Sequence, residues 1–197
     1  LMDTSNNIVT NNIFTSSAGH YPAGVGVLVQ NCNSTIISGN QITDNRDHGI
    51  YLSGCKRTVV RGNVVSDNHD HGMHVRFAGT FSVPIKDEYN CIAGNVFYHN
   101  DGLHATNPAN RGCGIQMQGH ADWNSIFGNS CVKNTAIGIR VQVEIDPDDD
   151  NPDTNKHPAK NNIVSGNLCC LNDLDDGIQI STEDPSNIDA NNKTIQL

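Results

Sequence analysis

A short motif, glycine followed by apolar, variable and apolar residues, recurs along the whole chain. Its six copies begin at Gly26, Gly49, Gly72, Gly114, Gly138 and Gly177. The first three copies are 23 residues apart. A unit of this length cannot bury its own apolar face, so it must stack on its neighbours. The repeat therefore predicts a solenoid rather than a fold built around one closed core.

Each period contains brief alternating apolar runs separated by Asn, Gly, Asp and Ser, which is the pattern of strands and turns. An Asn recurs once per period, at Asn12, Asn40, Asn63, Asn95, Asn129, Asn167 and Asn191. A second Asn follows most of these after five residues, at Asn45, Asn68, Asn100, Asn134 and Asn172. We expect parallel strands about 4.8 Å apart, with inward ladders of Asn amides that bond from coil to coil.

The overall composition fits this expectation and argues against several classes of function. The chain has 197 residues, 18 of them glycine, and only 5% aromatic residues. A net charge of −9 argues against a general binder of nucleic acid or of acidic membranes. No run approaches the roughly 20 apolar residues of a membrane span. We expect one domain over residues 1–197, and because neither end carries a capping segment, we expect a fragment of a longer chain.

The cysteines fall at fixed positions of the repeat. Cys32 and Cys55 each follow their motif glycine by six residues, so they should stack on adjacent coils. Cys91, Cys131 and Cys169 occupy positions that other coils fill with Ile, Val or Phe. We interpret these cysteines as small apolar core residues, and a Cys32–Cys55 disulfide stays open as an alternative.

The spacing between the repeated asparagines and the motif glycine changes only just before and just after the glycine-motif strand. From the second Asn to the glycine it is usually four residues but 14 from Asn100 to Gly114. From the glycine to the next Asn it grows from 14 residues to 23 after Gly72 and to 29 after Gly138. The step between the two asparagines is always five. Insertions in solenoids usually lie on a functional face, so we predict a groove whose floor is the stack of glycine-motif strands.

Alternation along these strands predicts which side chains form the floor of the groove. The outward pairs, coil by coil, are Leu28 and Gln30, Tyr51 and Ser53, His74 and Arg76, Gln116 and Gln118, Arg140 and Gln142, and Gln179 and Ser181. This strip contains two arginines, a tyrosine and several amides but no carboxylate. The acids Asp47, Asp70, Asp175 and Asp176 stand just before the glycines instead. A locally positive strip with arginine forks suits a polyanion that carries carboxylates, such as an acidic polysaccharide.

The repeat resembles the right-handed parallel β-helix superfamily of pectate-lyase-like proteins, over about six coils of about 23 residues. Within it, the stretch "SGNQITDNRDHGIYL" is similar to the repeats of mannuronan C-5 epimerases and uronate polysaccharide lyases. Such epimerases carry Tyr-Gly-Phe-Asp-Pro-His where this chain has His71-Gly72-Met73-His74-Val75-Arg76. The positions correspond but the residues differ. The resemblance implies a β-helix enzyme that removes the C5 proton of a uronate.

That chemistry needs a group that neutralises the carboxylate, a base and an acid. We assign His74 as the base, Tyr51 as the acid and Arg76 as the neutralising group, with His71 in a supporting catalytic role. The expected substrate contacts are Arg140, Gln116, Gln118, Gln142, Gln179, Asp70, Asp47 and His48. His48 and His71 occupy the same repeat position, so stacking of one on the other is an alternative explanation for both.

Two further classes of function stay open. The chain could be a glycan-binding or adhesion segment without catalysis, such as part of a phage tailspike. It could also be a glycoside hydrolase that uses Asp47 and Asp70, one coil apart, as its two carboxylates.

No cofactor is required by this interpretation. Asp146, Asp148 and Asp150 begin an acidic run that starts like a Ca²⁺-binding EF-hand loop, but Asn151 and His157 replace the Gly and Glu that the loop needs. We interpret the run as a solvated loop, with Ca²⁺ as the weaker alternative. The expected setting is extracellular or on a cell or virion surface, with homo-oligomers formed through the ends or sides of the solenoid.

Overall fold

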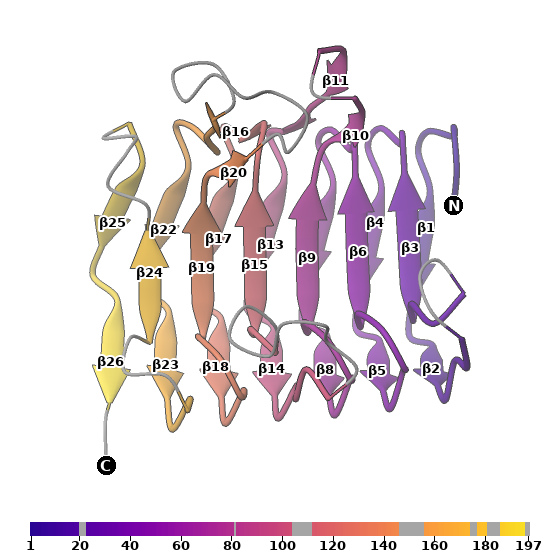
Figure 1. Ribbon diagram of the computed structural model, residues 1–197. Helices are drawn as coiled ribbons and strands as arrows, with labels where there is room; N and C mark the ends of the chain where they lie inside the picture. The colour runs from indigo at the N-terminus through magenta and orange to yellow at the C-terminus, as the bar shows by residue number, and fades with distance from the viewer. Residues whose placement is uncertain are drawn as a thin grey trace.

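The computed structural model describes residues 1–19, 23–80, 82–103, 112–145, 156–173, 177–180 and 186–195. The chain forms a right-handed parallel β-helix, as predicted, in which each coil from β3 onward adds one short strand to each of three sheets (Figure 1). Strand order in each sheet follows chain order, and neighbouring strands of all three sheets are parallel. No helix in the described part of the chain is long and apolar enough to cross a membrane.

We name the three sheets by the order in which a coil enters them. Sheet 1 contains β3 (Val27–Gln30), β6 (Ile50–Ser53), β9 (Met73–Arg76), β15 (Ile115–Gln118), β19 (Ile139–Gln142) and β24 (Ile178–Ile180). Sheet 2 contains β1 (Ile8–Thr10), β4 (Ile36–Ser38), β7 (Val59–Arg61), β13 (Cys91–Ala93), β17 (Ser125–Phe127), β22 (Ile163–Ser165) and β25 (Ile188–Ala190). Sheet 3 contains β2 (Ile13–Thr15), β5 (Gln41–Thr43), β8 (Val64–Ser66), β14 (Val96–Tyr98), β18 (Ser130–Val132), β23 (Leu168–Cys170) and β26 (Lys193–Ile195).

Short additional strands follow the sheet 1 strands and lie above their upper ends in Figure 1. They form three pairs: β10 (Ala78–Gly79) with β11 (Pro84–Ile85), β12 (Asp87–Glu88) with β16 (Ala121–Asp122), and β20 (Glu144–Ile145) with β21 (Lys156–His157). β10, β11 and β12 lie in the insertion after Gly72, and β20 and β21 lie in the insertion after Gly138, so one wall of the predicted groove exists in the described structure.

The core is one continuous row of apolar side chains inside the coil. In each sheet, every second residue of a strand points into the coil. Examples are Ile37 from sheet 2, Ile42 from sheet 3 and Leu52 from sheet 1, all fully buried. The motif glycine is required where the chain enters sheet 1. A Cβ on Gly49 would lie 2.7 Å from the carbonyl oxygen of Gly72 and 2.4 Å from Val65, closer than real Cβ atoms approach.

The predicted Asn ladders are confirmed. Asn95 Oδ1 accepts from the backbone N and the Nδ2 of Asn63 at 3.0 and 2.9 Å, and Asn95 Nδ2 donates to Val60 O and Asn129 Oδ1, both at 3.0 Å. The second ladder joins Asn45, Asn68, Asn100, Asn134 and Asn172 in the same way. One expected member was wrong: Asn192, not Asn191, continues the first ladder, because Asn191 occupies the positive-φ turn position before it.

A third ladder was not predicted. Its members are Asn7, Thr35, Thr58, Asn90, Asn124, Asn162 and Asn187. Thr35 and Thr58 interrupt the run of asparagines, so the sequence does not show the periodicity. A Thr at this position still provides its backbone N–H to the next Asn, as Thr58 does to Asn90 Oδ1 at 2.8 Å. Each corner between the three sheets therefore carries a side-chain ladder.

All seven cysteines are free thiols, so the alternative of a Cys32–Cys55 disulfide is wrong. Cys32, Cys55, Cys131 and Cys169 are buried, as expected for core positions. The prediction for Cys91 was wrong. It pairs in register with Val59 as predicted, but that position faces outward from sheet 2 and is half-buried.

Asp87 fastens the first insertion to the coil below it. Its two carboxylate oxygens accept from the backbone N–H groups of Gly54 and Cys55 at 2.9 and 2.8 Å, and the residue is fully buried. Burial raises the pKa of this carboxyl to about 8, although the two backbone hydrogen bonds act in the opposite direction. The insertion that follows β9 is thus held at its far end by a buried acid.

Asp87 should make the stability of the protein depend on pH. The folded protein binds this proton up to about pH 8, whereas an unfolded Asp loses it near pH 4. The contribution of Asp87 is therefore greatest below about pH 4 and falls as the pH rises towards 8, by up to about 1.4 kcal/mol per unit. Urea unfolding of wild type and Asp87→Asn at about pH 5 and about pH 8 measures this. The loss of stability at the higher pH should be smaller in the variant. Equal losses in both proteins would contradict the prediction.

Candidate functional site

Sheet 1 places two rows of outward side chains in register. One row joins Tyr51, His74, Gln116, Arg140 and Gln179, and the other joins Gln30, Ser53, Arg76, Gln118 and Gln142. The predicted outward pairs are confirmed wherever the structure describes them. Tyr51 and His74 lie on adjacent strands with ring centroids 5.0 Å apart, and Arg140 lies two strands beyond His74.

A pocket of about 460 Å³ opens on this face. It is lined by Asp47, His48, Tyr51, Asp70, His71, His74, Arg76, Gln116, Gln118, Gln142 and Glu144. A second hollow of about 190 Å³ shares Tyr51 and Arg76 and continues towards Gln30 and Ser53. The two hollows therefore lie next to each other on sheet 1.

Most residues assigned from the sequence meet in this pocket. Arg140 and Gln179 do not line it: they lie further along the same face, where Arg140 Nε donates to Gln179 Oε1 at 3.1 Å. Asp146, Asp148 and Asp150 lie outside the described residues.

Four aromatic rings pack together at the centre of the pocket. His48 stacks on Tyr51 and on His71, with ring centroids 5.2 and 5.3 Å apart. The ring of His74 stands edge-on to all three, and its Nδ1 lies 3.2 Å from His48 Nε2. His74 points outward from sheet 1 as predicted, yet only 8% of the residue is exposed because these rings cover it. The predicted stacking of His48 on His71 is confirmed, and it brings both rings into the site.

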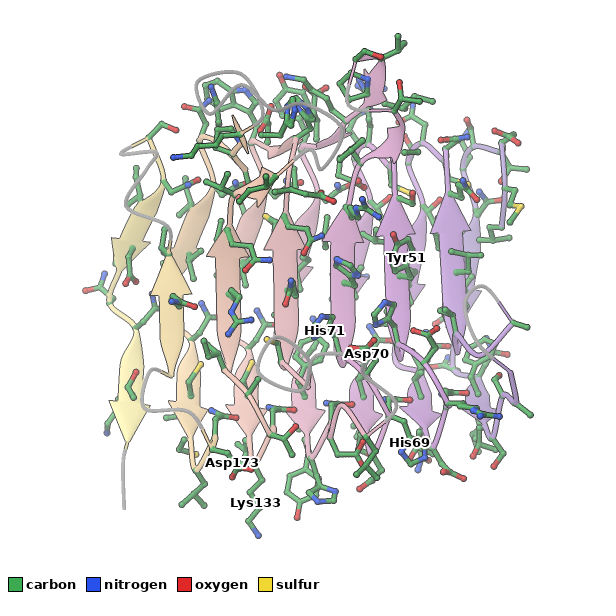
Figure 2. All side chains as sticks on the ribbon, in the orientation of Figure 1. Tyr51, His69, Asp70, His71, Lys133 and Asp173 are labelled. Carbon is green, nitrogen blue, oxygen red and sulfur yellow. The ribbon has the colours of Figure 1, made fainter. Side chains whose placement is uncertain are left out.

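The repeated sequence Asp-His-Gly places an acid beside each of these imidazoles. His48 Nε2 lies 3.4 Å from Asp47 Oδ1, and His48 Nδ1 lies 3.7 Å from Asp70 Oδ2. Figure 2 shows Asp70 and His71 in the turn below β9, with Tyr51 higher on β6. His71 Nδ1 accepts from the backbone N–H of Cys113 at 3.2 Å, so in neutral His71 the proton is on Nε2, which faces Asp70 Oδ1 at 3.6 Å.

Glu144 was missed from the sequence, and its presence corrects the expectation that the site contains no carboxylate on this side. It lies in β20 and forms an ion pair with Arg76 Nη2. Burial opposes the charge of Arg76, but the hydrogen bond and charge of Glu144, together with Tyr51, raise the pKa of Arg76 above its usual value. Extending the alternation of Arg140 and Gln142 by one further step would have identified Glu144.

The pocket is more acidic than predicted. Its lining contains three carboxylates, from Asp47, Asp70 and Glu144, but one guanidinium, that of Arg76. The amides are also tied to each other, because Gln118 Oε1 accepts from Gln116 Nε2 at 2.6 Å and from Gln142 Nε2 at 3.1 Å. The site therefore combines an anion-binding arginine with a group of acids and imidazoles on its other side.

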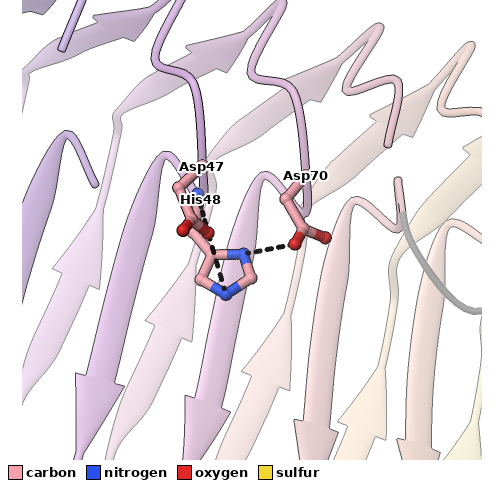
Figure 3. Close-up of side chains that lie close together, drawn as sticks. All are labelled: Asp47, His48 and Asp70. Atoms are coloured by element: carbon pink, nitrogen blue, oxygen red, sulfur yellow. Dashed lines mark hydrogen bonds and ion pairs between the residues drawn. The ribbon is translucent and has the colours of Figure 1, made fainter. Parts of the chain in front are cut away.

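This second group has the composition of a metal site. Asp47, His48 and Asp70 can each present a ligand atom, and these atoms all lie within 4.8 Å of one another (Figure 3). An imidazole with carboxylates is a donor set that suits borderline divalent ions such as Zn²⁺ and Cu²⁺. Among the described residues, no other group of His, Cys, Asp and Glu side chains meets this distance.

The sequence of residues 1–102, just over half of the chain, matches the family model described as periplasmic copper-binding protein (NosD). These residues include Asp47, Tyr51, His74 and Arg76. No curated protein sequence matches the chain significantly.

Among solved structures, the chain is similar to the periplasmic alginate epimerase AlgG, with 17% identity and a TM-score of 0.71 over 98% of this chain and 40% of that one. It is also similar to an alginate lyase from Paenibacillus sp. str. FPU-7, with 21% identity and a TM-score of 0.64 over 92% of this chain and 56% of that one. A third match is the A-module of the Azotobacter vinelandii mannuronan C-5 epimerase AlgE4, with 14% identity and a TM-score of 0.56 over 98% and 55% of the two chains.

The chain thus spans between 40% and 56% of the length of these three structures. At such low identities the similarity shows the parallel β-helix fold. The fold alone does not determine the activity.

Proposed function

This chain belongs to the NosD family of β-helix proteins, and within that family we propose that it binds an extended acidic polysaccharide and removes the C5 proton of a uronate, as a lyase or an epimerase. One observation carries the proposal: Tyr51, His74 and Arg76, from two adjacent strands, line the same pocket. The titles of the matched structures name epimerases and a lyase, which is consistent with this chemistry.

The first step is binding of the uronate carboxylate by Arg76. The guanidinium offers several donors, so it can hold Glu144 through Nη2 and a substrate carboxylate through its other N–H groups. Neutralising the carboxylate makes the neighbouring C5 proton acidic, because the negative charge left by its removal spreads onto the bound oxygens. Among the residues that line the pocket, Arg76 is the one whose side chain keeps its positive charge at neutral pH.

His74 is the base that takes the C5 proton. Its Nδ1 contacts His48 Nε2 at 3.2 Å, which couples the two imidazoles. His48 in turn lies between Asp47 and Asp70, which stabilise positive charge as it develops on the imidazole pair. Asp70 and His71 thus act on His74 through its neighbours rather than on the sugar.

Tyr51 supplies a proton to complete the reaction. In a lyase, the electron pair released from C5 forms the C4–C5 double bond, the C4–O4 bond breaks, and Tyr51 protonates the departing oxygen. In an epimerase, Tyr51 returns a proton to C5 from the opposite face. Tyr51 also interacts with Arg76, which places its phenol beside the neutralised carboxylate.

A test of this function uses alginate and polygalacturonate as substrates. Elimination produces an unsaturated sugar that absorbs in the ultraviolet, and epimerisation in D₂O places deuterium at C5, which NMR detects. Either signal is the expected result. Binding without either signal would support a glycan-binding segment, and new reducing ends without unsaturation would support a hydrolase that uses Asp47 and Asp70.

We place this activity outside the cytoplasm, because the matched family model and the AlgG structure are both described as periplasmic. Formation of homo-oligomers stays a prediction.

Replacing Glu144 by Gln should strengthen binding of acidic polymers. Glu144 compensates part of the charge of Arg76 and repels a substrate carboxylate. Such partly exposed pairs are worth about 1 kcal/mol or less, so KM should fall by about fivefold or less while turnover changes little. Initial rates on alginate fragments at low and high salt measure this, and salt should reduce the difference. A rise in KM would show instead that Glu144 holds Arg76 in place for the substrate.

A further inference from the structure

We propose that Asp47, His48 and Asp70 form a site for one divalent transition-metal ion of the borderline class, such as Zn²⁺ or Cu²⁺. The family description mentions copper without assigning residues. This site lies in the two adjacent turns that lead into β6 and β9 (Figure 3), at the edge of the pocket. The inference concerns metal binding and stands whether or not the protein acts on polysaccharides.

The three side chains are held in place before any ion binds. Asp47 and His48 are consecutive in one turn, where Asp47 Oδ1 accepts from the backbone N–H of His48 at 2.9 Å. The backbone of that turn is bonded to its neighbours, since Asp47 N donates to Gly24 O at 3.1 Å and His48 O accepts from Gly26 N at 3.0 Å. Asp70 occupies the equivalent turn of the next coil. The solenoid repeat therefore brings two carboxylates to the same imidazole.

The charge of the pocket favours a cation at this place. Of the three carboxylates in the lining, Glu144 pairs with Arg76, while Asp47 and Asp70 flank His48. Only 3% of Asp70 is exposed. Charges buried to this extent are paired or coordinate metals, and an ion with two positive charges offsets both carboxylates.

The donor types point to a transition metal rather than Ca²⁺. Calcium takes about six to eight oxygen ligands, whereas imidazole nitrogen binds Zn²⁺, Cu²⁺ and Ni²⁺ well. Three protein ligands leave coordination positions for water or another molecule. Around the ligands, His71 faces Asp70 and His74 contacts His48, as outer residues do in metal sites.

The chain provides its own control on the outside of the solenoid. His69 also lies between two acids, with Nε2 3.5 Å from Asp44 Oδ1 and Nδ1 3.3 Å from Asp101 Oδ1. This cluster has the same residue types, but its acids do not come within the distances of a shared ion. The side chain of Asp44 is 59% exposed, so water screens its charge.

The experiment titrates chelator-treated, fully reduced protein with Zn²⁺ by calorimetry and with Co²⁺ by absorbance. We expect one equivalent to bind wild type with d–d bands typical of nitrogen and oxygen ligands. His48→Gln and the double variant Asp47→Asn with Asp70→Asn should weaken binding by at least about 100-fold, because loss of a ligand exceeds the 10- to 100-fold effect of an outer residue. Asp44→Asn should bind like wild type. Zn²⁺ should also raise the melting temperature of wild type and of Asp44→Asn, but not that of the His48→Gln variant or the double variant.

Three results would overturn the proposal. Wild type that binds no Zn²⁺ or Co²⁺ removes the site. Unchanged affinity in His48→Gln assigns the ion to another place, and the variant Asp146→Asn with Asp148→Asn and Asp150→Asn then tests the acidic run. Thiolate charge-transfer absorption of bound Co²⁺ would assign it to the cysteines. Circular dichroism without metal establishes that each variant is folded, and if the double variant is not, His48→Gln decides.

Discussion

Replacing His74 by Gln is expected to lower turnover on uronate polymers by about 10²- to 10⁴-fold, the usual contribution of a general base. Gln keeps a polar side chain of similar reach beside His48 but cannot accept the C5 proton. Because Arg76 and the amides proposed to contact the substrate are retained, KM should change little. Tyr51→Phe should cause a loss of similar size, since it removes the proton donor but keeps the ring that stacks on His48.

The measurement is the initial rate of unsaturated product or of deuterium incorporation at C5. Gln41→Ala is a suitable control, because Gln41 is an exposed amide on β5 of sheet 3, outside the pocket. Near-wild-type rates in both His74→Gln and Tyr51→Phe would reject the assignment of acid and base. A large rise in KM with unchanged turnover in His74→Gln would assign His74 to binding.

Replacing Asn95 by Ala is expected to destabilise the fold by about 3 to 5 kcal/mol. The change leaves the backbone N and Nδ2 of Asn63 without their acceptor and removes the side-chain donor to Val60 O. Asn129 Oδ1 loses one of its two donors and keeps the backbone N–H of residue 95. Each buried group left unsatisfied costs about 1–3 kcal/mol, and a small cavity adds to this. Only 1% of Asn95 is exposed, so water cannot readily replace the amide. Since whole domains are stable by about 5–15 kcal/mol, this is a large share of the total.

Chemical unfolding followed by circular dichroism measures this loss. Gln41→Ala is the matched control, because Gln41 is an exposed amide at the start of β5 and its removal should cost less than about 0.5 kcal/mol. If the two variants lost the same stability, the ladders would be a consequence of the stacking and not a cause of its stability.

The fold was predictable from this sequence because a solenoid repeats its local rules. The spacing of Gly26, Gly49 and Gly72 sets the length of a coil, and strand alternation then sets which residues face out. This is why the register of Tyr51, His74, Gln116 and Arg140 was predicted residue by residue. The third ladder was missed because Thr35 and Thr58 interrupt its run of asparagines. For Cys91 the repeat position was predicted correctly, but its burial was not.

The site was predictable in part. Residues on the sheet 1 strands were placed correctly, whereas Glu144 lies one alternation step past Gln142, in β20, and the predicted strip ended at Gln142. The prediction of a positive pocket was also wrong, because two of the three acids of the pocket come from the turns that precede the sheet 1 strands and not from the strands themselves. Asp47 and Asp70 reach the floor of the groove from those turns, and only the three-dimensional packing shows that their carboxylates approach the same imidazole.

The fixed five-residue step between the two Asn ladders separates the parts of the chain that can change from those that cannot. Adding or removing one residue between Asn63 and Asn68 would move both asparagines off their partners in the neighbouring coils. The connections that follow sheet 1 have no such constraint, and their lengths differ from coil to coil. During evolution, a protein of this architecture can gain or lose residues in the walls of its groove and keep the supporting framework intact.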